Sequence, residues 1–264
     1  TEALWILNIA LAIIMFGVAL AIKVDDFKRL IKKPKILLVG IFSQFFLLPA
    51  LTFLAIVLIE PHPSFALGMI MIAACPGGNV SNFFSKMAKG NAALSVSLTA
   101  FATLVCLVMT PFNLQFWGGL YEPTNAILKT VELDPFELFK LVLLILGIPL
   151  ILGMLVNHFY EKTAKKIERV LKPFSMIVFL ALIIIAFYDN IDVFLDYIYL
   201  VAALVILHNI GAYIIGFYTA KTFGLDKRDQ KTISIETGIQ NGGLGLLLIF
   251  QFFDGLGGMA LLAA

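Results

Sequence analysis

The sequence predicts an all-α polytopic membrane protein. Hydrophobic residues make up 61% of its 264 residues and charged residues only 14%, whereas a soluble domain contains about 45–50% apolar residues. Apolar runs of about 20 residues, the length that spans a bilayer as a helix, recur along the whole chain. Strands of a membrane barrel would instead alternate in polarity over about ten residues. The runs therefore predict transmembrane helices.

We predict nine membrane segments. In order they cover about residues 4–22, 36–59, 65–85, 91–117, 136–157, 173–188, 198–220 and 232–252, with a last one from about 257. This last segment has room for only about eight residues before Ala264, which at about 1.5 Å per residue is too short to cross a bilayer. We therefore expect the last helix to be truncated.

The basic residues follow a strict alternation between the predicted loops. All of the 19 Lys and Arg residues except Lys129 and Lys140 fall in the first, third, fifth and seventh loops. Such loops lie on the cytoplasmic side by the positive-inside rule, which places the N-terminus outside. A polybasic lipid-binding surface is the alternative, and it accounts for one cluster but not for the alternation.

The predicted orientations also indicate an inverted repeat. Segment 4–22 would run inward and segment 173–188 outward, and each begins a group of four helices whose third member contains a break. Segment 136–157 is left over, and its counterpart is missing from the N-terminal half. The repeat rests on topology, because the two halves share little residue-level similarity.

Two segments carry the breaks. The run Pro76-Gly77-Gly78-Asn79-Val80-Ser81-Asn82 interrupts segment 65–85, and the run Gly238-Ile239-Gln240-Asn241-Gly242-Gly243 interrupts segment 232–252. Proline removes a backbone donor and glycine relaxes the backbone, so both segments should unwind. Ser81 or Asn82 and Asn241 are the predicted N-caps of the half-helices that follow. Paired interruptions in corresponding helices are typical of the substrate site of a secondary transporter.

Glu236 is the one acidic residue placed deep in a membrane-length apolar segment. A charge at that depth costs about 3 kcal/mol on insertion scales and indicates a functional site with a partner. The other polar side chains at membrane depth that could join it all carry oxygen: Gln44, Ser81, Asn82, Ser95, Thr99 and Gln240. An all-oxygen set with a single negative charge suits a monovalent cation better than a transition metal. A proton on Glu236 is the rival interpretation.

The remaining reactive side chains predict no second chemistry. Cys75 and Cys106 lie in apolar segments, where cysteine usually packs as a small hydrophobe. His208 is more simply read as an interhelical hydrogen bonder than as a ligand. An intramembrane enzyme would need a second catalytic acid near Glu236, and no other acid is predicted at membrane depth. A ligand sensor is the other alternative, distinguished by signalling without flux.

Three motifs resemble a known family. The segments 74–82 (ACPGGNVSN), 94–99 (LSVSLT) and 236–241 (ETGIQN) closely resemble the signature segments of the bile acid/sodium symporter family. Ile14–Gly17 and Gln44–Pro49 are also similar to it, so the resemblance covers essentially the whole chain in order and spacing. Many members have Thr where this chain has Asn79, which bears on the substrate contact.

The resemblance implies a fold and a set of sites. The fold is an inverted-repeat transporter with two broken, crossing helices, in which segments 4–22, 136–157 and 173–188 form a panel domain and residues 36–117 and 198–264 a core domain. The first sodium site would consist of Ser81, Asn82, Ser95, Thr99 and Glu236. The second would consist of Gln44, Glu236, Gln240 and the backbone carbonyls of Thr237 and Ile239. Substrate would bind between panel and core near Asn79 and Asn241.

The function that follows is sodium-coupled import of an amphipathic organic anion of the bile acid class by alternating access. The alternative is a sodium- or proton-coupled transporter of a smaller carboxylate such as pantoate or a 2-keto acid. The expected partners are sodium ions, two per cycle, the organic anion and the lipid bilayer of a bacterial inner membrane. We expect neither a nucleic-acid partner nor an enzymatic activity.

Overall fold

The computed structural model describes residues 2–131, 136, 139–140, 143–255 and 257–264. These residues are almost entirely helical and contain no strand. Four helical stretches among them are long and apolar enough to cross a membrane: Pro34–Ile59, Ala92–Leu120, Glu161–Asp189 and Ile191–Thr222. The class of polytopic helical membrane protein is thereby supported, while the count of nine segments and the inverted repeat stay predictions.

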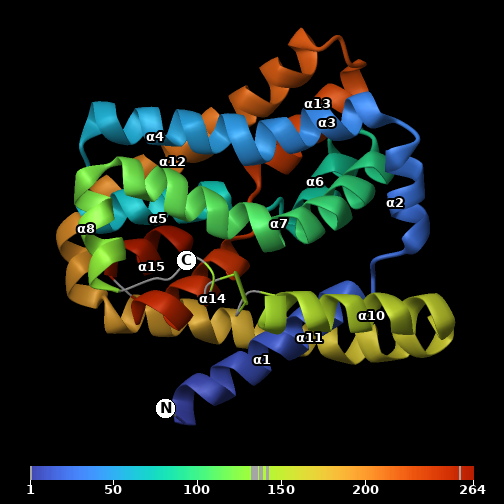
Figure 1. Cartoon of the computed structure of the whole chain (residues 1–264), viewed down its shortest axis with the longest axis horizontal. Helices are drawn as coiled ribbons and strands as arrows, with labels where there is room; N and C mark the ends of the chain where they lie inside the picture. The colour runs from blue at the N-terminus through green and yellow to red at the C-terminus, as the bar shows by residue number, and fades with distance from the viewer. Residues whose placement is uncertain (1, 132–135, 137–138, 141–142, 256) are drawn as a thin grey trace.

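Figure 1 shows the order and arrangement of the helices. The first half of the chain forms α1 (Glu2–Ala19), α2 (Val24–Ile31), α3 (Pro34–Phe42), the π-helical turn η1 (Ser43–Leu47), α4 (Leu48–Ile59), α5 (Pro63–Ala74), α6 (Asn79–Met87), α7 (Ala92–Leu120) and α8 (Glu122–Thr130). The second half forms η2 (Leu143–Gly147), α10 (Ile148–Phe159), α11 (Glu161–Asp189), α12 (Ile191–Thr222), α13 (Lys227–Gly238), α14 (Gly242–Phe253) and α15 (Gly257–Ala263). The start of predicted segment 136–157 falls partly outside the described residues.

One predicted boundary is wrong because hydropathy marks the apolar part of a helix rather than its start. Helix α11 begins at Glu161, not near Pro173, and it continues through that proline. The basic residues assigned to the fifth loop therefore lie on the first turns of a helix. Glu161 stabilises that end through ion pairs with Lys23 at 2.9 Å and Lys165 at 3.0 Å. The short helices α2 and α8 have too few apolar residues to register as membrane segments, so they were not predicted.

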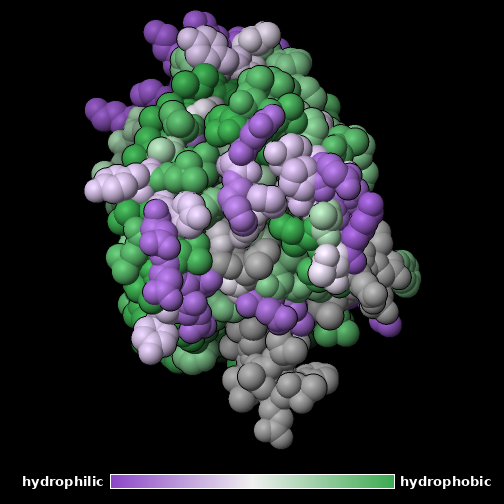
Figure 2. All heavy atoms as spheres, turned by 90° about the vertical axis from the view of Figure 1, so that its left-hand side faces the viewer, coloured by the Kyte–Doolittle hydropathy of each residue, from purple (hydrophilic) through white to green (hydrophobic). Residues whose placement is uncertain are grey.

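Helices α1, α10 and α11 pack against one another along the lower edge of Figure 1, away from α3, α4 and α13 at the upper edge. Glycine permits the close approach of α1 and α10, because a Cβ on Gly153 would lie 2.7 Å from the carbonyl oxygen of Phe16. Helices α5, α7, α14 and α15 fill the space between the two edges. Figure 2 looks onto the end that carries the α4–α5 turn and α8, where hydrophilic side chains gather among apolar flanks.

Both predicted breaks are present, and they cross. Helix α5 stops at Ala74 before α6 begins at Asn79, and α13 stops at Gly238 before α14 begins at Gly242. The Gly78 N–H donates to the Ile239 carbonyl at 2.9 Å, and the Asn241 N–H donates to the Pro76 carbonyl at 2.8 Å. Each unwound segment thus satisfies backbone groups of the other, which lipid could not do.

The two half-helices after the breaks are capped differently. Asn241 caps α14 as predicted, because its Oδ1 accepts a hydrogen bond from the Leu244 N–H at 3.0 Å. The prediction for α6 is wrong: the helix begins earlier, Gly78 occupies the N-cap position, and no side chain caps it. Ser81 and Asn82 therefore lie within the helix, where their side chains are free to serve the site described below.

Proline also reshapes the α3–α4 segment. Pro49 has no N–H to donate to the carbonyl of Phe45, and the chain forms the π-helical turn η1 just before it. Asn113 on α7 donates its Nδ2–H to that carbonyl at 2.9 Å. On the same helix, the Thr110 hydroxyl donates at 2.6 Å to the carbonyl of Ala74, which the first break leaves without its helical partner. Helix α7 therefore satisfies backbone groups released on two neighbouring segments.

We expect Asn113→Leu to destabilise the protein. The side chain is 1% exposed, and its loss leaves the buried Phe45 carbonyl without a donor, a cost of about 1–3 kcal/mol. Thermal unfolding in detergent should show a lower melting temperature for this variant. The half-buried Asn125 on α8 supplies the control, and an equal shift in Asn125→Leu would contradict the role assigned to Asn113.

Candidate ion-binding site

Glu236 lies in the last turns of α13 and is fully buried. The Ser81 hydroxyl on α6 donates to its Oε1 at 2.5 Å, and the Ser95 hydroxyl on α7 donates to the same oxygen. The Thr99 hydroxyl lies 2.9 Å from Glu236 Oε2 and 3.3 Å from Asn82 Oδ1. Three helices therefore converge on one carboxylate, and the structure brings together all five residues of the first predicted cluster.

No basic side chain neutralises this carboxylate among the described residues. The ion pairs found there, Lys23–Glu161, Lys28–Asp25 and Lys165–Glu161, all involve side chains that are at least half exposed. A buried charge without a cationic partner is costly unless a metal ion or proton compensates it. Each neighbouring hydroxyl keeps two lone pairs and can rotate to present them to a cation. The cluster can therefore bind a small cation with little movement.

A second set of polar groups adjoins the first. Gln44 on η1 is fully buried, and neither its Oε1 nor its Nε2 has a hydrogen-bond partner among the described residues. The Oε1 of Gln240 is likewise buried and unpartnered, while its Nε2–H donates to the Thr237 carbonyl at 2.6 Å. Buried amide oxygens are normally hydrogen-bonded, so each exception requires an explanation such as an ion.

Gly77 is the point where the two sets meet. A Cβ at this position would lie 2.7 Å from Glu236 Oε2 and 3.5 Å from Gln44 Nε2. Glycine is thus required for the close approach of the first break to the carboxylate. The carbonyl of Ile239, which accepts from Gly78, retains a lone pair for a further ligand.

Sequence reasoning missed one buried contact of this site. Ser43 is fully buried on η1, and its Oγ lies 2.9 Å from the Thr237 Oγ1. It ties the segment that carries Gln44 to the segment that carries Glu236. A serine directly before a membrane-depth glutamine was the available signal. His208 was predicted to be an interhelical hydrogen bonder, and its contact with the Thr52 hydroxyl at 2.9 Å confirms this.

The two predicted substrate contacts are placed at the half-helix N-termini. Asn79 is the first residue of α6, and its side chain lies outside the described part of the structure. Asn241 uses its Oδ1 to cap α14, which leaves its Nδ2 as the group that can turn to a ligand.

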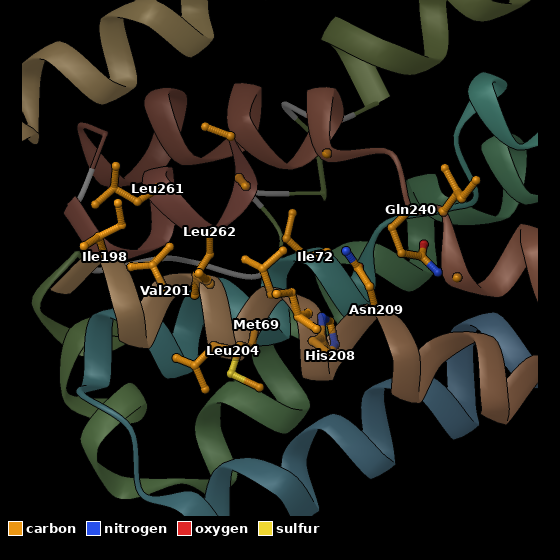
Figure 3. A pocket seen from close by; sticks show the side chains of 18 of the residues that line it. Met69, Ile72, Ile198, Val201, Leu204, His208, Asn209, Gln240, Leu261 and Leu262 are labelled. Atoms are coloured by element: carbon orange, nitrogen blue, oxygen red, sulfur yellow. The ribbon is translucent and has the colours of Figure 1, made fainter. Parts of the chain in front are cut away.

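A cavity of about 650 Å³ opens beside the second break. Figure 3 shows Gln240, Asn209 and His208 toward one end of it, whereas Ile198, Val201 and Leu261 lie toward the other. Most of its lining is apolar and comes from α5, α12 and α15. An apolar cavity with a few polar groups is the usual form of a small-molecule site.

Within the described residues no group of three His, Cys, Asp or Glu side chains could hold a metal ion. The oxygen groups around Glu236 are instead those that hard cations prefer. Two discontinuous helices that cross beside a buried carboxylate, in a polytopic helical protein, define the class of secondary transporters.

The comparisons with known proteins identify the family. The sequence profile of the Sodium Bile acid symporter family matches residues 8–197. An uncharacterised sodium-dependent transporter of Bacillus subtilis (strain 168) is 36% identical over 250 residues, which cover 95% of this chain and 75% of that one. The chain belongs to the Sodium Bile acid symporter family, a family of sodium-dependent transporters.

More distant relatives differ in the substrate that their names state. The protein named "Probable sodium/metabolite cotransporter BASS1, chloroplastic" of Arabidopsis thaliana is 29% identical over 93% of this chain and 59% of its own length. The human ileal sodium/bile acid cotransporter is 28% identical over 89% of this chain and 66% of its own length. The chain thus spans less than two thirds of these two relatives. All the names denote transporters or cotransporters and none denotes an enzyme.

Proposed function

We propose that this protein is a sodium-coupled symporter that imports an amphipathic organic anion of the bile acid class by alternating access. The observation that carries the proposal is the fully buried Glu236, which contacts the hydroxyls of three residues on two other helices at the crossing of the broken segments. The negative charge of this carboxylate would attract a sodium ion. Because the carboxylate lies at the crossing, sodium binding would affect how the two broken helices pack.

Two sodium ions fit the polar groups at the crossing. We assign the first to Ser81, Asn82, Ser95, Thr99 and Glu236. We assign the second to Gln44, Gln240, Glu236 and the carbonyls of Thr237 and Ile239. The unpartnered amide oxygens of Gln44 and Gln240 support the second assignment, because a cation would satisfy both.

Alternating access would move the two edges of the molecule against each other. We assign α1, α10 and α11 to the panel and the helices around the crossing to the core, as their separate positions in Figure 1 support. The organic anion would bind near Asn79 and Asn241, where the N-termini of α6 and α14 offer partial positive charge. The neighbouring apolar cavity is large enough to admit part of an amphipathic body.

The charge distribution supports an orientation. The exposed acidic residues Glu60, Glu122 and Asp189 lie just after α4, at the start of α8 and at the end of α11. The predicted cytoplasmic loops hold nearly all Lys and Arg residues. We infer a bacterial inner-membrane protein with the N-terminus outside.

The energetics suit accumulation of a solute. Two sodium ions that enter with one monovalent anion carry one net positive charge, and a membrane potential of about 100 mV then contributes about 2.3 kcal/mol. Each sodium ion that moves down an about tenfold gradient adds about 1.4 kcal/mol. The total of about 5 kcal/mol would sustain an accumulation of several thousandfold.

Uptake into proteoliposomes tests the proposal. With an inward sodium gradient we expect accumulation of a labelled bile acid, and replacement of sodium by choline should reduce the initial rate at least about tenfold, since it removes both the bound ions and their gradient. Competition by unlabelled pantoate and a 2-keto acid would identify a smaller carboxylate as the better substrate.

Other outcomes would select another function. Uptake that persists in choline and follows a proton gradient would indicate that a proton on Glu236, rather than sodium, drives transport. Ligand binding without flux under any gradient would indicate a sensor.

A further inference from the structure

A second layer of buried polar groups lies about one to two helical turns from Glu236, toward the end of the molecule that carries the α6–α7 turn. Asp229, Thr232 and Glu236 are spaced by three and four residues on α13, which places them on one face of the helix. Their exposed fractions are 3%, 0% and 0%. The face of α13 that presents Glu236 therefore carries buried polar residues as far as the N-terminal turn of the helix.

The two facing helices repeat this spacing. On α6, Ser85 follows Ser81 by four residues and so lies on the same face as a residue that binds Glu236. Asn91 is the N-cap of α7, one turn before Ser95. The Asn91 N–H donates to the Thr232 Oγ1 at 2.8 Å, and its Nδ2–H donates to the Asp229 Oδ1 at 2.8 Å. We call Ser85, Asn91, Asp229 and Thr232 the lower layer.

One hydroxyl of the lower layer is unpartnered and could contribute to binding a cation. Ser85 is fully buried, and its Oγ has no hydrogen-bond partner among the described residues. Gly90 allows the α6–α7 turn to approach α13 closely. A Cβ there would lie 2.7 Å from the Thr232 Oγ1 and 3.0 Å from the Ser85 carbonyl oxygen. The Thr232 hydroxyl and the backbone carbonyl of Ser85 therefore both lie against Gly90.

Asp229 gives the lower layer a negative charge, and none of the ion pairs found among the described residues involves it. Its hydrogen-bond donor is the neutral amide of Asn91. The two adjacent cations on α13 turn to backbone carbonyls instead, Arg228 to Gly90 at 3.4 Å and Lys231 to Ala88 at 3.0 Å. A buried carboxylate that has only a neutral hydrogen-bond donor attracts a cation.

We propose that the lower layer is a transient binding station through which a sodium ion passes between the Glu236 site and the water beside the α6–α7 turn. The proposal rests on the proposed function, because it requires sodium at Glu236. Hydroxyl and carboxylate oxygens are suitable ligands for a hard cation, and successive weak sites let a bound ion leave. The competing interpretation is a clamp that only fastens the α6–α7 turn to α13.

The variant Asp229→Asn separates the two interpretations. If the lower layer is a station, the equilibrium sodium affinity of this variant, measured by titration calorimetry in detergent, should change less than about twofold. Exchange of radioactive sodium across the proteoliposome membrane should slow at least about tenfold, which is the lower end of what a charged cleft adds to an association rate. Asp226→Asn is the matched control, because the exposed Asp226 caps α13 and Asn caps equally well. The clamp would be established if Asp229→Asn lowers the sodium affinity, the rate of sodium exchange and the melting temperature together.

Thiol labelling of Ser85→Cys tests the station without any organic substrate. The native Cys75 and Cys106 are fully buried, so the unmodified protein supplies the background. We expect a cationic methanethiosulfonate reagent to react at least about tenfold faster than an anionic one of similar size, and saturating sodium should slow the reaction. Ser64→Cys is the control, since the Ser64 Oγ on α5 is also buried and unpartnered.

The outcomes distinguish this proposal from the function on which it rests. Equal rates with both reagents, or a folded Ser85→Cys protein that neither reagent labels, would overturn the station. If the unmodified protein shows sodium-dependent uptake and both variants match their controls, only the station is rejected. If the unmodified protein shows no sodium dependence, the proposed function itself fails.

Discussion

Glu236→Gln should abolish sodium-dependent transport while the protein still folds. A unit charge about 4 Å from a cation contributes about 4 kcal/mol at an effective dielectric constant of about 20, so its loss should weaken sodium binding by more than about a hundredfold. Glutamine keeps the shape of glutamate, and its oxygen can still accept from Ser81 and Ser95. Sodium titration of the purified variant and uptake in proteoliposomes measure the effect.

The control for this variant is Glu122→Gln, which makes the same change at an exposed position on α8. It should transport at the rate of the unmodified protein. Near-normal sodium activation in Glu236→Gln, with a normal melting temperature, would refute the assignment of both sodium sites, because both include this carboxylate.

Gly77→Ala should have the next largest effect. The new Cβ would lie 2.7 Å from Glu236 Oε2 and 2.9 Å from the Glu236 carbonyl oxygen. Neither the carboxylate, which Thr99 contacts, nor the backbone of α13 can yield without opening the crossing. We expect a loss of sodium affinity of at least about tenfold, corresponding to about 1.4 kcal/mol, together with a lower melting temperature.

Gly211→Ala provides the comparison for Gly77→Ala. Gly211 lies within α12, and a Cβ there would meet nothing within 4 Å. Alanine in a helix interior should be neutral or slightly stabilising, by up to about 1 kcal/mol. If sodium binding is equally strong in both variants, the crossing tolerates movement that the structure does not indicate.

Local chemistry made the helix breaks predictable. Proline and paired glycines remove backbone donors and steric restraint within a few residues, so the gaps between α5 and α6 and between α13 and α14 could be located from residues 76–78 and 238–243 alone. Glu236 stood out for a similar reason, because a carboxylate in an apolar run is costly wherever the chain folds.

Contacts between distant segments were less predictable. Nothing in the residues around Asn113 indicates that its amide compensates for Pro49, 64 positions earlier, by binding the Phe45 carbonyl. Ser43 and Thr237 are separated by 194 positions, yet their hydroxyls lie 2.9 Å apart. The start of α11 was misplaced because a helix can extend beyond its apolar part when charged side chains stabilise its first turns.

The sequence by itself determined that this protein is a helical membrane protein with two interrupted segments and one deeply placed carboxylate, because hydropathy, proline and charge act through the local chain and the lipid around it. The family resemblance named the oxygens expected around that carboxylate, but only the tertiary structure decided how they reach it. The hydroxyls of Ser81, Ser95 and Thr99 reach Glu236 from helices far away in sequence. Their directions depend on how α6, α7 and α13 pack, and backbone hydrogen bonds between the two breaks hold the start of α6 beside the end of α13.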